Sequence, residues 1–173
     1  MYCATADSTN NASGWVVLSH CEIGPVRAGA TGLLCTGPVW PCDTGRVQTP
    51  VNPSSIASPA ANYHHAVLVT EPTRWLYTSG VVPTAPDGST PASLADQAAV
   101  VWQNIGAMLD EVAMSAEDIV SVTTYVVVGE DLGSVMAARD AMLGDHCAAS
   151  TLVTVPALAQ PQWRMEVAVV AAR

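Results

Sequence analysis

The sequence predicts an α+β fold in which two helices cover one face of a mostly antiparallel sheet. Three observations support this prediction. Half of the 173 residues are hydrophobic and only 12% are charged, so the chain can build a core and is not disordered throughout. Two segments repeat apolar residues at helical spacing, whereas the other regular segments are dense in β-branched or aromatic residues. Their order is strand, strand, helix, strand, helix, strand, strand.

The first two strands are expected at residues 65–69 and 74–79, joined by a turn at Glu71-Pro72-Thr73. Residues 51–61 are rich in Pro and Ser and should be extended. Thr90 is the expected cap of the first helix, with Pro91 at its first position. The apolar residues that follow at helical spacing are Leu94, Ala98, Val101, Trp102, Ile105, Leu109 and Val112.

The second half of the chain continues the alternation. Residues 115–118 carry a capping signal for one helical turn, and residues 119–128 are dense in Val, Thr and Tyr, as in a strand. Residues 131–143 predict the second amphipathic helix, which Gly144 ends. Two further strands are expected at 151–155 and 164–171, joined by a loop bounded by prolines.

The last predicted strand is apolar on both faces. Met165, Val167 and Val169 lie on one face, and Ala168 and Val170 lie on the other. A strand that is apolar on both faces needs cover on both. The two helices can cover one face, so residues 1–50 or another subunit must cover the other.

Composition excludes several classes of function. The net charge of −9 disfavours nucleic acid or an anionic membrane as a partner. All six basic residues are arginines, which excludes lysine-dependent Schiff bases, lysine-anchored pyridoxal phosphate and a P-loop. No apolar run is long enough to cross a bilayer. No signal-peptide pattern begins the sequence, so we expect a cytoplasmic protein.

The cysteines form no recognisable framework. Four lie within residues 3–42 and Cys147 stands alone, with no C-x-x-C pair. We favour scattered free thiols, with a disulfide and a metal site as the alternatives. His64 and His65 are consecutive, so in a strand they point to opposite faces and cannot chelate one metal together. One of these two histidines should be buried and the other exposed.

Glu166 is the most informative carboxylate. It shares a face with Ala168 and Val170 in a strand that is otherwise apolar at its centre. Burying an acid costs several kcal/mol unless it is paired, and such groups suit general acid–base work. The alternative is a structural role, in which Glu166 pairs with Arg164 or with another arginine at an interface. No G-x-S-x-G or G-x-G-x-x-G motif is present to point to a hydrolase triad or a dinucleotide site.

An ordered set of short motifs resembles the RidA/YjgF family over residues 51–173. Each motif is weak alone, but their order and spacing together are fairly specific. The segments that carry the resemblance are residues 61–67, 77–83, Gln97 with 104–105, 118–126, 149–153 and 165–167.

The resemblance implies a chorismate-mutase-like fold and a homotrimer with a small-molecule pocket in each cleft between subunits. It also implies hydrolysis of reactive imines and enamines to a carbonyl compound and ammonia, with no metal or organic cofactor. Tyr63, Ser79 and Gly80 match residues that line the family's pocket. Glu166 matches the acid that positions or activates water, and Thr151 matches a pocket residue that is often cysteine.

Two positions depart from the family pattern. Ala149 stands where the catalytic branch has an arginine that grips the substrate carboxylate, and Met136 replaces an asparagine. An alanine cannot make the bidentate contact of an arginine. If the ligand is an anion, we expect Arg164 or Arg139 to bind it, with Arg164 favoured because it lies two residues from Glu166 on the same strand face. Otherwise Arg164 pairs with a carboxylate and Arg139 is a solvated helix residue.

Two classes of function therefore stay open. One is a variant imine or enamine hydrolase. The other is a non-catalytic trimer that binds a small metabolite or a protein, and a different pocket reaction is a further possibility. In either case residues 1–50 form an N-terminal extension and residues 51–173 the family-like domain. Residues 34–41 faintly resemble residues 76–83, so the extension either holds a degenerate extra hairpin or matches by chance.

Overall fold

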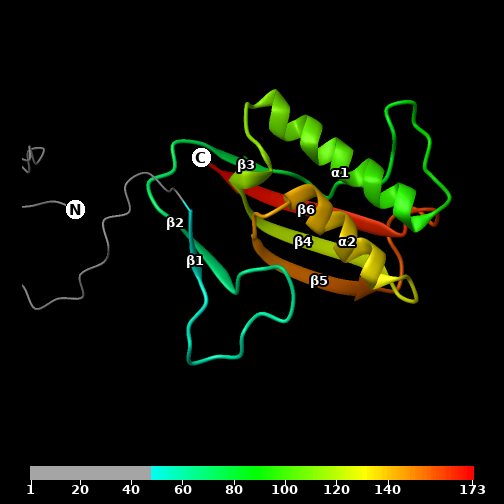
Figure 1. Ribbon diagram of the computed structural model, residues 1–173. Helices are drawn as coiled ribbons and strands as arrows, with labels where there is room; N and C mark the ends of the chain where they lie inside the picture. The colour runs from blue at the N-terminus through cyan, green and yellow to red at the C-terminus, as the bar shows by residue number, and fades with distance from the viewer. Residues whose placement is uncertain (1–47) are drawn as a thin grey trace, which may run out of the picture. The chain divides into compact units, whose positions relative to one another are not determined.

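The computed structural model of the chain describes residues 48–173 (Figure 1). The expected N-terminal extension lies outside the described residues except for its last three. The same holds for four of the cysteines and for the first copy of the faint repeat. Cys147, which is described, is a free thiol. The division between extension and domain stays a prediction.

A four-stranded sheet forms the centre of the fold, in the order β3-β6-β4-β5. The pairs β3–β6 and β6–β4 are antiparallel, and β4–β5 is parallel. The parallel pair is possible because α2 connects β4 to β5 across one face of the sheet. These elements are β3 (Trp75–Tyr77), β4 (Ile119–Val127), α2 (Leu132–Leu143), β5 (Ala149–Val155) and β6 (Met165–Ala172).

Both helices, α1 (Leu94–Glu111) and α2, lie on the same face of this sheet (Figure 1). The expected α+β fold is confirmed. The start of α1 differs from our prediction, because the helix is capped by Ser93 rather than Thr90. Ser93 Oγ accepts a hydrogen bond from the Asp96 N–H at 3.1 Å, which is the usual N-cap contact, and Pro91 precedes the helix. The α2 helix ends at Gly144 as expected, with φ of 58°.

The strand β2 (Ala66–Val69) has a partner that the sequence did not reveal. It pairs antiparallel with β1 (Gln48–Val51) in a separate two-stranded sheet. The sequence predicts only extended chain over residues 51–61, and a turn at residues 71–73 that joins two successive strands. Instead β2 and β3 belong to different sheets. The apolar pattern identified β2 as a strand, but it carried no information about which strand lies beside it.

The core lies between the sheet and the two helices. Met165, Val167 and Val169 of β6 are at most 2% exposed and face the helices. Ala168 and Val170 point to the opposite face, where they are only half-buried. The helices thus cover one face of the sheet, as expected. Among the described residues, nothing covers the other face. Its large exposed side chains are Trp75, Tyr77, Tyr125 and Val153.

A β-bulge interrupts the pairing of β3 with β6. Tyr77 pairs with Val170, whereas Val81 forms the next bridge with Val167, so one strand carries an extra residue. The Thr78 hydroxyl fills the gap in the ladder and accepts a hydrogen bond from the Val169 N–H at 3.0 Å. The bulge brings Gly80 against β6.

We predict that Thr78→Val destabilises the protein by about 1–3 kcal/mol, because it leaves the Val169 N–H without an acceptor in the core. Thr78→Ser, which keeps the hydroxyl, should lose less than half as much. Urea unfolding of both variants measures this difference. Equal losses for the two variants would contradict this prediction, because the hydroxyl would then contribute no more to stability than the methyl group.

Candidate functional site

Glu166 and Gly80, two of the residues expected at the site, lie in direct contact. A Cβ added at Gly80 would overlap the Glu166 carboxylate. The glycine is thus required by close approach and not by an unusual backbone angle. Ser79, beside it in the bulge, is exposed. No hydrogen bond or ion pair reaches the Glu166 carboxylate from residues 48–173, and the side chain is half-buried.

Thr151 and Ala149 lie on the same open face as Glu166, but at the other edge of the sheet. The register places Thr151 beside Thr123 and Ala168, and Glu166 beside Tyr125. With β4 between them and an offset of two residues, the Cα atoms of Thr151 and Glu166 are about 12 Å apart. One chain alone therefore does not bring these two side chains into contact.

Tyr63 joins the half of the site at the β5 edge. The next residue, His64, forms a bridge with Ala149, and its N–H donates to the Ala148 carbonyl at 3.0 Å. The Tyr63 ring is half-buried and packs edge-on against His65, with ring centroids 5.8 Å apart. The expected site residues thus fall into two groups, with Ser79, Gly80 and Glu166 at one edge and Tyr63, Ala149 and Thr151 at the other.

The two arginines proposed as anion binders have partners within the chain. Arg164 lies on the Glu166 side of the sheet, with its Nε 3.6 Å from a Glu130 oxygen, and its side chain is 44% exposed. Arg139 lies on the helix side, where its Nη1 donates to Ser150 Oγ at 3.0 Å. The alternative of a solvated Arg139 is wrong, because the residue is only 6% exposed.

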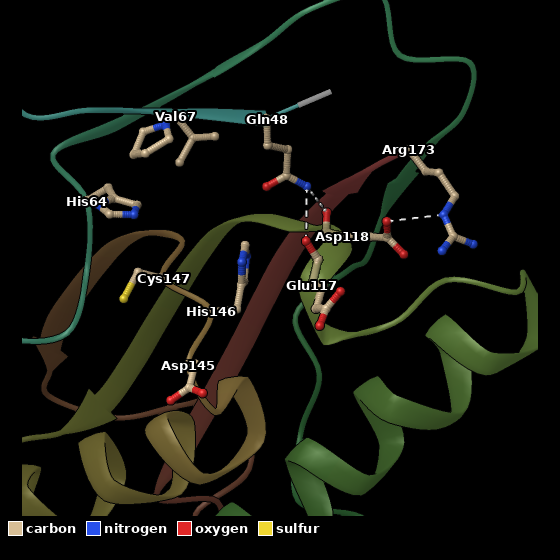
Figure 2. Close-up of a pocket in the computed structure, with 10 residues that line it drawn as sticks. Gln48, His64, Val67, Glu117, Asp118, Asp145, His146, Cys147 and Arg173 are labelled. Atoms are coloured by element: carbon tan, nitrogen blue, oxygen red, sulfur yellow. Dashed lines mark hydrogen bonds and ion pairs between the residues drawn. The ribbon is translucent and has the colours of Figure 1, made fainter. Parts of the chain in front are cut away.

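A cavity lies elsewhere in the described part of the chain, beneath the β1–β2 hairpin (Figure 2). Its volume is about 640 Å³. Pro50 and Val67 line it from the hairpin, while His146 rises into it from the segment before β5 (Figure 2). The remaining lining residues are Gln48, His64, Glu117, Asp118, Asp145, Cys147 and Arg173.

Hydrogen bonds fix the tautomers of two histidines at this cavity. Asn52 Oδ1 accepts from the His65 N–H, so the Asn52 amide nitrogen, 2.9 Å from His64 Nδ1, must donate to that ring atom. The neutral His64 ring therefore carries its proton on Nε2. His146 Nε2 lies 2.7 Å from the Ile119 carbonyl and donates to it. The pair was not found from the sequence, because 82 residues separate the two histidines and no motif links them.

Burial lowers the pKa of His64, and repulsion from the His146 imidazole lowers it further. As the consecutive-histidine pattern suggested, His64 is more buried than its neighbour, although only in part, and His65 is exposed. Among residues 48–173, no group of three or more histidine, cysteine or acidic side chains is arranged to hold a metal ion. None of the helices in this range is long and apolar enough to cross a membrane.

The lowered pKa of His64 predicts a loss of stability on acidification. The unfolded chain, with an ordinary histidine pKa near 6.5, binds more protons than the folded chain just below that pH. The contribution of His64 is therefore complete above about pH 6.5 and declines as the pH falls towards the lower folded pKa. Between pH 7.5 and pH 5, the melting temperature of the wild type should fall further than that of His64→Gln. Parallel curves would contradict this prediction.

A family model and solved structures of known proteins match this chain. The family model described as endoribonuclease L-PSP matches residues 54–173. YyfB of Yersinia pestis, described as a conserved Rid-family protein of unknown function, is 25% identical with a TM-score of 0.67; the match covers 74% of this chain and 100% of that one. The yeast protein YEO7 is 29% identical, with a TM-score of 0.54 and coverage of 72% and 98%. Yeast Mmf1 is 27% identical, with the same TM-score and coverages. No curated protein matches the sequence.

Proposed function

Because the chain belongs to the Rid/YjgF family, whose model is described as endoribonuclease L-PSP, we propose that it hydrolyses a small imine or enamine in a pocket between subunits. The observation that carries the proposal is the contact between Glu166 and Gly80 on the open face of the sheet. The carboxylate has no partner among the described residues and is free to act on water. The same residues carry the resemblance to the family.

In the proposed reaction, Glu166 takes a proton from water as the water oxygen bonds to the carbon of a protonated imine. The electron pair of the C=N bond moves to nitrogen and gives a carbinolamine. Glu166 then returns this proton to the nitrogen, the C–N bond breaks, and ammonia leaves as Glu166 takes the hydroxyl proton and the carbonyl forms. An enamine enters the same route after tautomerising to its imine. Thr151 and backbone donors near Gly80 hold the substrate.

The pocket is proposed to need a second copy of the chain. Glu166 and Gly80 lie at one edge of the open face, and Thr151 and Tyr63 lie at the other. A head-to-tail contact joins opposite edges of neighbouring copies and closes into a ring, such as the trimer that the family resemblance implies. Such a contact also covers exposed apolar side chains, including Tyr77, which is 69% exposed.

We propose an uncharged or weakly acidic substrate. Ala149 supplies no cation, Arg139 is buried on the helix side, and Arg164 faces Glu130. A substrate carboxylate therefore has weak support, and 2-aminoacrylate should be a poor substrate. Cleavage of RNA, which the family description suggests, is disfavoured by the net charge of −9 and the absence of lysine.

A non-catalytic trimer that binds a metabolite or a protein is the second candidate, and a different pocket reaction is a third. Ala149 favours both over hydrolysis, because it removes the group that the catalytic branch of the family uses to grip its substrate. The presence of Glu166 favours hydrolysis. These candidates differ in whether ammonia is released.

We predict that Glu166→Gln lowers ammonia release from an uncharged imine at least 100-fold, because the amide cannot accept a proton from water. Gly80→Ala should also lower the rate, because the added Cβ would overlap the Glu166 side chain from its carboxylate back to Cγ and force it into another rotamer, at a cost in stability of about 1–3 kcal/mol. An ammonia assay on a panel of imines with and without carboxylates tests both variants.

Gly106→Ala is the matched control. A Cβ at Gly106 meets Met142 Cε at 3.6 Å, an ordinary contact, so activity should be unchanged. If wild type releases no ammonia from any imine in the panel, the hydrolase proposal fails and the other two candidates stand. Release by Glu166→Gln at the wild-type rate would remove the acid from the mechanism.

We predict that the wild type has three times the chain mass of 17.9 kDa in solution, as measured by light scattering. Tyr77→Glu should give monomers at micromolar concentration, because it puts a charge into the proposed contact. Met108→Glu, on the helix layer and 39% exposed, should leave the trimer intact. A wild-type monomer would rule out a pocket made between copies.

A further inference from the structure

We propose that Arg139 is a positioning residue rather than a substrate ligand, and that it holds the Tyr63 segment (residues 61–65) against β5. The role in the reaction rests on the proposed function, whereas the positioning itself is a property of the fold. This role accounts for a buried charge that the apolar pattern of α2 does not explain.

The Arg139 guanidinium spans two elements. Its Nε and Nη2 both donate to Asp140 Oδ1, at 2.9 and 2.7 Å, and its Nη1 donates to Ser150 Oγ at 3.0 Å. Ser150 lies between Ala149 and Thr151 at the start of β5. The guanidinium therefore links α2 to the Ser150 side chain, between the two positions of β5 that are expected in the site.

Asp140 extends this connection to the Tyr63 segment. While Oδ1 accepts from Arg139, Oδ2 accepts from Asn62 Nδ2 at 3.0 Å, and Asn62 immediately precedes Tyr63. The other end of the segment is held by the His64 N–H, which donates to the Ala148 carbonyl. Tyr63 is thus fixed on both sides, by Asn62 and by His64.

The difference in burial between the two charges explains why Arg139 fixes the position of the Asp140 carboxylate. The Arg139 side chain is 7% exposed and that of Asp140 is 33% exposed, so the arginine is the more desolvated partner. A buried guanidinium needs its acceptors, and it therefore locks Asp140 into the one geometry that also receives Asn62. Removing Asp140 would strand a buried charge, whereas Arg139→Met removes the charge together with its need for a partner.

The test measures amide hydrogen exchange in the full-length protein. In Arg139→Met we expect the His64 amide to exchange at least 10-fold faster, while the Val167 amide in β6 keeps its wild-type rate. Asn62→Leu should reproduce this result without touching the guanidinium, and it serves as the second variant if Arg139→Met folds poorly. Arg74→Met, at an exposed arginine that donates to the Val112 carbonyl, should change neither rate.

Measurements of KM and kcat distinguish a positioning role of Arg139 from a purely structural one. On an uncharged imine, Arg139→Met should raise KM several-fold with kcat within twofold of wild type, because Tyr63 is displaced and Glu166 is not. A His64 exchange rate within twofold of wild type in both Arg139→Met and Asn62→Leu would overturn the proposal. If wild type hydrolyses no imine, the proposed function fails and the exchange result alone decides whether Arg139 positions the segment.

Discussion

The fold depends on one strand, β6, being hydrogen-bonded along both of its edges. Pairing with β3 on one side and β4 on the other removes any freedom of register, and alternation then assigns each side chain to a face. Met165, Val167 and Val169 must enter the core. Glu166 must consequently face away from the helices, at the one place where the bulge in the neighbouring strand brings a glycine close enough to receive it.

Much of this arrangement follows from local sequence patterns. The helical spacing from Leu94 to Leu109 identifies α1, and the dense Val and Thr residues identify β4, because burial imposes those periods directly. The cap of α1 was also available from the sequence. Ser93 and Asp96 have the spacing of an N-cap contact, but Pro91 is an equally ordinary first helical residue and directed the prediction to Thr90.

Other features lay beyond any local pattern. The partner of β2 is a strand of four residues that contains Pro50, so β1 lacks the β-branched run by which strands are detected. The meeting of His64 and His146 depends on how a loop and the start of β5 pack, which residue spacing does not encode. Glu166 and Gly80 were each expected at the site from the family resemblance, but their contact and its cause, one extra residue in a ladder, could not be predicted from the sequence.

The bridge between His64 and Ala149 limits how much of the β5 edge is open to pairing with a strand of another molecule. β5 is one of the two edge strands of the four-stranded sheet, and its sequence, Ser150 to Val155, has the β-branched character of segments that add strands from other molecules. The His64 segment occupies the start of that edge and leaves a shorter open stretch. The segment therefore occupies backbone groups at the start of β5 that another strand could otherwise pair with, and a chain cut before residue 66 would expose them and lose Tyr63.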